Sequence, residues 1–408
     1  MNRNTTKKLP GFSLALLFTL YFSQGLPSGF LAHTLPALMR ESGVSLEYIG
    51  LIKLLAIPWV LKFLWAPFVD RTGVRSLGSH KSWILLTQSL LAGLVFIASY
   101  STQDTAFNSL IIICLVGVLF VNMASATQDI ATDGLAMILL PERLRGLANS
   151  IQVVGYKLGM IVASSVLLLS FDYIGWSLSF RILALVLVLL LIPTLFYHQS
   201  AERQIVGVSS NTSIFQSYKG FFTQPSMLSW VVVLLSYKVS DSLGSAMIKP
   251  MLVDEGYSLS ELAGLSFFSS IIGLIGALFA GWAYYKLGAK RLLLSAGLLQ
   301  SLGVMAYALL VSESGDPAWV YLVSMFEQFS DGLSTVALFS VMMSRCRAGN
   351  EGADFTVQAS ILVLLSGLMG VVSGVVAGAL GFQLLFVTAG VLGLFSLLPV
   401  LYYYKHNC

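Results

Sequence analysis

The sequence predicts an all-α membrane protein in which 12 transmembrane helices form two six-helix bundles related by a pseudo-two-fold axis. Three observations predict this fold. Of the 408 residues, 56% are hydrophobic and only 10% are charged, whereas soluble domains carry about 25% charged residues. Apolar runs of about 20 residues, long enough to cross a bilayer, recur along the whole chain. The two halves of the chain also carry matched motifs in the same order.

The apolar runs are separated by short polar connections and give twelve candidate spans. The spans cover approximately residues 12–38, 47–69, 82–101, 108–137, 147–171, 176–197, 224–252, 259–286, 290–311, 317–344, 353–379 and 381–403. The longest connection, 198–223, is polar. It predicts an N-terminal six-helix bundle (1–198), a cytoplasmic linker (199–223) and a C-terminal six-helix bundle (224–408).

Lysine and arginine, which are enriched in cytoplasmic loops, orient the spans. With the N-terminus inside, only Arg40 and Lys249 fall on the opposite side. The cytoplasmic segments hold Arg3, Lys7, Lys8, Arg71, Arg75, Lys81, Arg143, Arg145, Arg203, Lys219, Lys286, Lys290, Arg291, Arg345, Arg347 and Lys405. We therefore expect a multi-pass protein with both termini in the cytoplasm.

The two halves repeat one another at a constant offset of 214 between the first and seventh spans. The matched pairs are Pro36 and Pro250, Glu41 and Glu255, Glu47 and Glu261, and Gly50 and Gly264. The fourth and tenth spans carry Asp129-x-x-x-Asp133 and Glu327-x-x-x-Asp331. Transporter folds are often built from such internal repeats, so the pattern predicts a duplicated six-helix unit.

Ionisable residues inside membrane spans are costly and mark substrate or proton pathways. Those found here are Lys53, Lys62, Asp129, Asp133, Lys157, Arg181, Lys238, Asp241, Glu327 and Asp331. Similar depth on neighbouring spans predicts a pair between Asp129 and Lys157. Lys238 and Asp241, three residues apart, are expected to pair on one helix face. For both pairs the alternative is a structural role that fixes helix register.

The remaining charges differ in position. Lys53 and Arg181 lie within two turns of a membrane face and are expected to extend to the surface. For Lys62, extension to the cytoplasmic surface is an open alternative. Asp129 and Asp133 lie one turn apart, and two such carboxylates cannot both be comfortably ionised in a low-dielectric site. Either one is therefore a candidate proton carrier.

These considerations divide the candidate residues by role. We expect substrate binding by Gln24, Gln128, Lys157, Lys238, Asp241 and Glu327. We expect proton coupling by Asp129, Asp133 and Asp331. A cytoplasmic gate is expected from Asp70, Arg71, Arg75, Glu142 and Arg145, with a solvated turn as the alternative. No catalytic residues are assigned.

Several function classes are disfavoured. Three cysteines and four histidines show no metal-ligand spacing, so neither a metal nor another cofactor is expected. Scattered basic residues disfavour nucleic-acid binding. The absence of a Gly-x-x-x-x-Gly-Lys-Ser/Thr loop excludes ATP hydrolysis by this chain. With carboxylates as candidate proton carriers, a proton gradient is the expected energy source. A membrane-embedded enzyme would need a catalytic constellation, which His33 alone does not supply. The expected partners are the lipid bilayer and a small-molecule substrate, and the chain is expected to be a monomer.

Several segments resemble a known family. The loop Asp70-Arg-Thr-Gly-x-Arg75 resembles the major facilitator superfamily signature, although 65–67 replace its usual glycine. Thr127-Gln-Asp-Ile-Ala-Thr-Asp133-Gly, with 62–67, 140–146 and 154–160, is similar to the AmpG-like branch. The opening segments 22–38 and 45–50 most resemble siderophore importers of the RhtX/FptX type.

The resemblance implies proton-coupled import by alternating access across a bacterial inner membrane. The RhtX/FptX likeness implies that the substrate is a ferri-siderophore moved from periplasm to cytoplasm. The alternative is a muropeptide, as in AmpG permeases, or another amphiphilic anion. Efflux is not excluded by these physical arguments, because direction depends on the gradients.

Overall fold

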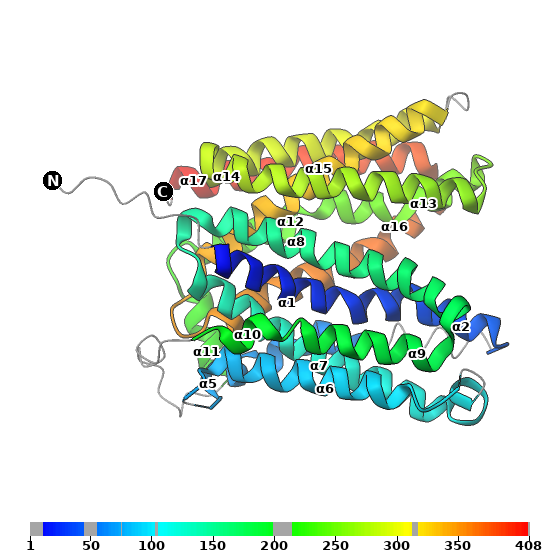
Figure 1. Ribbon diagram of the computed structural model, residues 1–408. Helices are drawn as coiled ribbons and strands as arrows, with labels where there is room; N and C mark the ends of the chain where they lie inside the picture. The colour runs from blue at the N-terminus through cyan, green and yellow to red at the C-terminus, as the bar shows by residue number, and fades with distance from the viewer. Residues whose placement is uncertain are drawn as a thin grey trace. The chain divides into compact units, whose positions relative to one another are not determined.

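The computed structural model describes residues 11–44, 55–74, 76–102, 105–198, 214–311 and 317–406. The regular elements in these ranges are helices, and no strand occurs among them (Figure 1). Contacts between residues group the chain into two compact units. Unit 1 comprises the described residues of Met1–Pro141, Val154–Ile214 and Arg347–Thr356, and unit 2 comprises those of Glu142–Val153, Phe215–Cys346 and Val357–Cys408.

Unit 1 is built mainly from the first half of the chain. Its helices are α1 (Gly11–Gly29), η1 (Phe30–Thr34), α2 (Leu35–Glu41), α4 (Ile57–Leu61), η2 (Lys62–Leu64), α5 (Ala66–Arg71), α6 (Ser79–Ala98), η3 (Thr105–Ser109), α7 (Ile111–Leu139), the end of α8 (Arg145–Ile161), η5 (Val162–Val166), α9 (Leu167–Leu189) and α10 (Ile192–Phe196). Helix α6 packs against both α7 and α9, and α1 packs against α7 (Figure 1).

Unit 2 is built mainly from the second half. Its helices are η4 (Glu142–Leu144), the start of α8, α11 (Ile214–Phe222), α12 (Met227–Tyr237), α13 (Val239–Asp254), α14 (Leu259–Leu310), α15 (Pro317–Ser344), most of α16 (Glu351–Phe395) and α17 (Leu397–His406). Helix α14 packs against α13, α15 and α17. Residues 199–213 of the predicted linker lie outside the described residues, and the linker's last part forms α11.

Eight helices of the described chain are long and apolar enough to cross a membrane. Two of them each contain two predicted spans. Helices α14 and α16 are interrupted at Gly288 and Gly381, whose φ values of 76° and 81° strain any residue with a side chain. The predicted boundaries at 286–290 and 379–381 fall at these glycines, so the sequence placed both breaks correctly.

The described part of the predicted span 47–69 is not one continuous helix. It consists of α4, the 3-10 turn η2 and α5. Pro58 and Pro67 lie in the first turns of α4 and α5. Proline is compatible with a first helical turn but not with a helix interior, so the two prolines favour short segments. Lys62 lies on the turn between them and faces α7 as a result.

Helices α1 and α8 approach each other closely along a row of small residues. A Cβ atom at Gly25 would lie 2.9 Å from the Cα of Gly159, and one at Gly29 would lie 2.7 Å from the Cα of Met160. Both separations are below van der Waals contact, so only glycine permits this crossing. The close approach fixes the depth of Gln24 inside unit 1.

Candidate functional site

The first charged group inside a span of unit 1 is an ion pair between α7 and the turn η2. The Lys62 ammonium pairs with the Asp129 carboxylate. The two residues are only 5% and 8% exposed, and the ammonium lies 5.4 Å from the centre of the Trp59 ring. The alternative in which Lys62 extends to the cytoplasmic surface is therefore wrong. The break between α4 and α5 turns this side chain inward, which a continuous helix would not have done.

The two carboxylates of α7 have separate donors. Asp133 is 1% exposed and accepts a hydrogen bond of 2.9 Å from the Tyr21 hydroxyl of α1. Asp129 pairs with Lys62. Lys157 lies half-buried on α8, and its pairing with Asp129 stays a prediction. Asp129 thus contacts a cation, and one of the contacts of Asp133 is with a tyrosine hydroxyl.

Glutamine side chains connect four helices in the interior of unit 1. Gln24 of α1 donates to the Thr132 hydroxyl of α7 over 2.9 Å. Gln128 donates to Gln88 of α6 over 2.9 Å, and Gln88 donates to the carbonyl oxygen of Leu187 of α9 over 2.9 Å. All three glutamines are fully buried. The predicted substrate residues Gln24 and Gln128 therefore lie within a helix-to-helix network in this structure.

Unit 2 holds a second charged group, which we call the Lys238 cluster: Lys238, Asp241, Gln300, Glu327, Asp331 and Ser334. Lys238 lies at the break between α12 and α13, with φ −98° and ψ 7°. Its ammonium lies 3.3 Å from Asp241, as predicted, and 2.7 Å from Asp331 of α15. It also donates to the Ser334 hydroxyl over 2.9 Å. The predicted pair is confirmed, and Asp331 is its closer partner.

Gln300 of α14 connects the acids of this cluster. Its side-chain amide donates to Asp241 over 3.3 Å and to Glu327 over 3.1 Å. Glu327 is 1% exposed. It also accepts from Gln328 over 2.9 Å. One ammonium therefore serves two carboxylates directly, while the third carboxylate is held by neutral amides.

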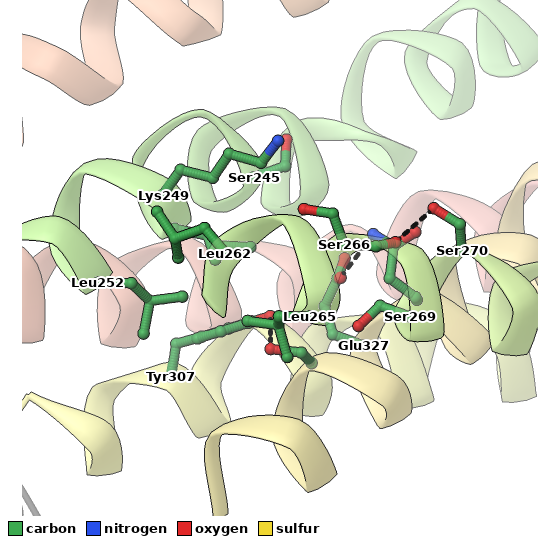
Figure 2. A pocket seen from close by; sticks show the side chains of 13 residues that line it. Ser245, Lys249, Leu252, Leu262, Leu265, Ser266, Ser269, Ser270, Tyr307 and Glu327 are labelled. Atoms are coloured by element: carbon green, nitrogen blue, oxygen red, sulfur yellow. Dashed lines mark hydrogen bonds between the residues drawn. The ribbon is translucent and has the colours of Figure 1, made fainter. Parts of the chain in front are cut away.

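A cavity of about 240 Å³ opens beside Glu327. Its walls come from α13, α14 and α15, so it lies within unit 2. Figure 2 shows Glu327 and Ser269 on one side and Lys249 with Ser245 on another. Glu327 is the member of the Lys238 cluster that lines this cavity.

The predicted gate residue Asp70 lies on α5, and its side chain contacts the first turn of α16. Its carboxylate accepts from the backbone amides of Gly352 over 3.1 Å and Ala353 over 2.8 Å. His80 approaches the same carboxylate at 3.2 Å. The first amides of a helix have no partner within the helix, and an acid there also interacts favourably with the helix dipole. Asp70 therefore caps the first turn of α16. This defined contact differs from the solvated turn that was the alternative to a gate in the sequence analysis.

The other gate residues are distributed differently. Arg71 ends α5 next to Asp70, and Arg75 lies outside the described residues. Glu142 and Arg145 belong to unit 2, where they form a 3.4 Å pair in which the Glu142 side chain is 73% exposed. Near the Asp70 contact, Arg347 and Asp354 form a bidentate pair with distances of 2.8 and 2.7 Å.

The Major Facilitator Superfamily profile matches residues 17–364. The chain belongs to the major facilitator superfamily. It is 27% identical over 392 residues to the anhydromuropeptide permease of Escherichia coli (strain K12), a match that covers 94% of this chain and 79% of that permease. Among solved structures, the fold is similar to that of the E. coli fucose:proton symporter FucP, with a TM-score of 0.75 and 15% sequence identity. The match covers 97% of this chain and 98% of FucP. The fold is also similar to that of the human organic anion transporter MFSD10, with a TM-score of 0.74 and 14% identity over 96% of this chain and 100% of MFSD10.

These similarities confirm the predicted superfamily fold and the likeness to AmpG permeases. The chain is a multi-pass membrane transporter and not an enzyme. The narrower resemblance to RhtX/FptX siderophore importers finds no support among the similar proteins reported above. The E. coli relative is an anhydromuropeptide permease, the class given as the alternative in the sequence analysis.

The sequence analysis did not identify several residues of this superfamily member that contact the predicted site residues within unit 1 or within unit 2. They are Tyr21, His80, Gln88, Gln300 and Ser334. Gln88 and Gln300 had a visible signal, because each is a polar residue inside an apolar span. His80 had none, since its contact with Asp70 depends on how the chain folds back after α5.

Replacing Asp70 by alanine is expected to destabilise the protein by about 1–3 kcal/mol, because the amides of Gly352 and Ala353 then lose their acceptor. Asp70→Asn keeps one carbonyl oxygen and should be intermediate. Glu142→Ala, at an exposed side chain, is the control and should change stability by less than about 0.5 kcal/mol. Thermal unfolding of the purified proteins in detergent measures the difference. Equal melting temperatures for Asp70→Ala and Glu142→Ala would show that the cap contributes nothing.

Proposed function

We propose that this protein is a proton-coupled importer of the bacterial inner membrane that carries a muropeptide or a closely related amphiphilic anion. Support for the substrate class comes from the E. coli anhydromuropeptide permease, which aligns with 94% of the chain. Support for coupling comes from the carboxylates buried inside the spans. Both termini are placed in the cytoplasm by the distribution of lysine and arginine.

The Lys238 cluster is the observation that carries the coupling proposal. Lys238 contacts Asp241 and Asp331, and Gln300 connects Asp241 to Glu327. Counting only the described residues that make up this cluster, and with all of them ionised, one positive charge would stand against three negative charges. Such an excess is costly in a low-dielectric interior. A proton bound by one carboxylate reduces the excess, so proton binding and release at this cluster can accompany the transport cycle.

The charged group in unit 1 has a different balance. Lys62 neutralises Asp129, and Asp133 accepts from the neutral Tyr21 hydroxyl. Asp133 is therefore a second buried carboxylate of unit 1, 1% exposed, that the proposal assigns to proton transfer. Within the proposal, Asp129, Asp133 and Asp331 handle protons, while Lys157, Lys238, Asp241 and Glu327 face substrate groups. Gln24 and Gln128 act by positioning α7 through their hydrogen bonds.

Uptake by proteoliposomes containing the purified protein tests the substrate. We expect labelled anhydromuropeptide to accumulate when the outside is acidic, and a protonophore to abolish the accumulation. A labelled ferri-siderophore should not accumulate under the same conditions. If the siderophore accumulates and the muropeptide does not, the proposed substrate class is wrong, while the assignment to the superfamily is unaffected.

A further inference from the structure

The cavity in unit 2 has a buried end and an exposed mouth. At the buried end lie Glu327 and Ser269, which are 1% and 4% exposed. At the mouth lie Ser245 and Lys249, both exposed. Leu252, among other apolar residues, lines a further part of the wall. Figure 2 shows these side chains around the cavity, with Lys249 and Glu327 on separate elements.

Ser269 carries the strongest indication of a ligand. Its hydroxyl is buried, lines the cavity and has no hydrogen-bond partner in the described part of the chain. Neighbouring Ser270 also lines the cavity, but its hydroxyl donates to the carbonyl oxygen of Ser266 over 2.7 Å. Buried hydroxyl groups are normally paired, because an unpaired one loses its bonds to water. The Ser269 hydroxyl is thus available to a molecule that enters the cavity.

Glu327 provides acceptors at the same end. One carboxylate oxygen accepts from Gln300 and the other from Gln328. A carboxylate has about four acceptor positions, so two remain for hydroxyl or amide donors of a ligand. The opposite chemistry stands at the mouth, where the Lys249 ammonium favours an anionic group. The apolar side chains of Leu252, Leu262 and Leu265, which also line the cavity, can pack against the apolar face of a sugar ring.

The size of the cavity limits the ligand to a fragment. A volume of about 240 Å³ is below the range of roughly 300–1,000 Å³ that encloses a drug-sized ligand. One ring or one residue-sized group matches this volume, and a whole muropeptide does not. The cavity is therefore a subsite for part of a larger substrate.

We propose that this cavity binds an acylamino-sugar ring bearing an anionic group, with ring donors on Glu327, a hydrogen bond to Ser269 and the anion beside Lys249. The inference rests on the proposed function, since it names the part of the carried anion that unit 2 recognises. It adds Ser269 and Lys249 as specificity-determining residues. Neither belongs to the substrate-binding or proton-coupling residues that the sequence predicted.

Equilibrium dialysis of the full-length protein in detergent tests the subsite without requiring transport. The probes are labelled N-acetylmuramic acid and labelled N-acetylglucosamine, which share an acylamino-sugar ring and differ in a carboxylate. Ser269→Ala is expected to weaken binding of both by about threefold to tenfold. Lys249→Gln is expected to weaken only the acid, by about twofold to fivefold. Ser270→Ala is the matched control and should bind both probes like the wild type, because its hydroxyl bonds within its own helix.

The outcomes separate the subsite from the transport function. If neither probe binds the wild type, or if Ser269→Ala and Lys249→Gln bind both probes unchanged, the subsite is overturned and the Ser269 hydroxyl holds only water. If the probes bind as expected but anhydromuropeptide is not taken up, the subsite stands and the proposed substrate is wrong. If uptake occurs and is insensitive to both substitutions, the subsite alone is wrong.

Discussion

Lys62→Met is expected to destabilise the protein by about 3–5 kcal/mol, because it leaves the Asp129 carboxylate charged and unpaired inside unit 1. The double variant Lys62→Met with Asp129→Asn should recover most of that stability, since no uncompensated charge remains. Transport per folded molecule should nevertheless stay at least tenfold below the wild type in the double variant, a loss of about 1.4 kcal/mol in transition-state terms. Thermal unfolding and accumulation of labelled anhydromuropeptide driven by an inward proton gradient, measured on the same preparations, provide the two readouts.

The double variant decides between a structural and a functional ion pair. Lys219→Met, which removes an exposed lysine on α11, is the control and should leave both stability and gradient-driven accumulation unchanged. If the ion pair has only a structural role, the double variant should recover transport together with stability. If the double variant transports at the wild-type rate, Lys62 and Asp129 only hold helices together.

Asp331→Asn is expected to uncouple transport from the proton gradient. The asparagine keeps the shape of the side chain, and Lys238 retains Asp241 at 3.3 Å, so the fold should persist. The variant loses an ionisable group 2.7 Å from the ammonium. Accumulation driven by an inward proton gradient should fall by about tenfold or more. Counterflow without a gradient should remain within about threefold of the wild type, because substrate exchange needs no net proton movement.

Thr335→Val is the matched control for this variant. The Thr335 hydroxyl donates to the same Asp331 carboxylate over 3.1 Å, so valine removes a neighbour of the carboxylate but leaves its charge. Gradient-driven accumulation should persist in Thr335→Val. Wild-type accumulation in Asp331→Asn would assign the coupling proton to another acid.

Much of the fold was predictable because lipid imposes simple requirements on a chain. Apolar length located the spans, and Gly288 and Gly381 end helices where the sequence placed boundaries. The second span was the exception. Its apolar length indicated one helix, but Pro58 and Pro67 divide it, and the turn between them redirects Lys62.

The site was predictable only where partners are close in sequence. Lys238 and Asp241 share one turn, so their pairing followed from helix geometry. Asp331 lies on another helix, and the contact with Lys238 depends on packing that no local pattern encodes. The same holds for the cap that Asp70 provides to α16, since the two are 282 residues apart. Substrate identity was the least accessible, because residues resembling siderophore importers also occur in a chain similar to a muropeptide permease.

Substrate-driven proton movement in proteoliposomes tests the central claim that buried carboxylates couple protons to transport. Adding anhydromuropeptide to liposomes that contain the wild-type protein, without an imposed gradient, should make the outside medium more alkaline as protons enter with the substrate. Asp129→Asn and Asp331→Asn should abolish or strongly reduce this signal. Substrate entry with no change in external pH, or wild-type proton movement in both variants, would contradict the account.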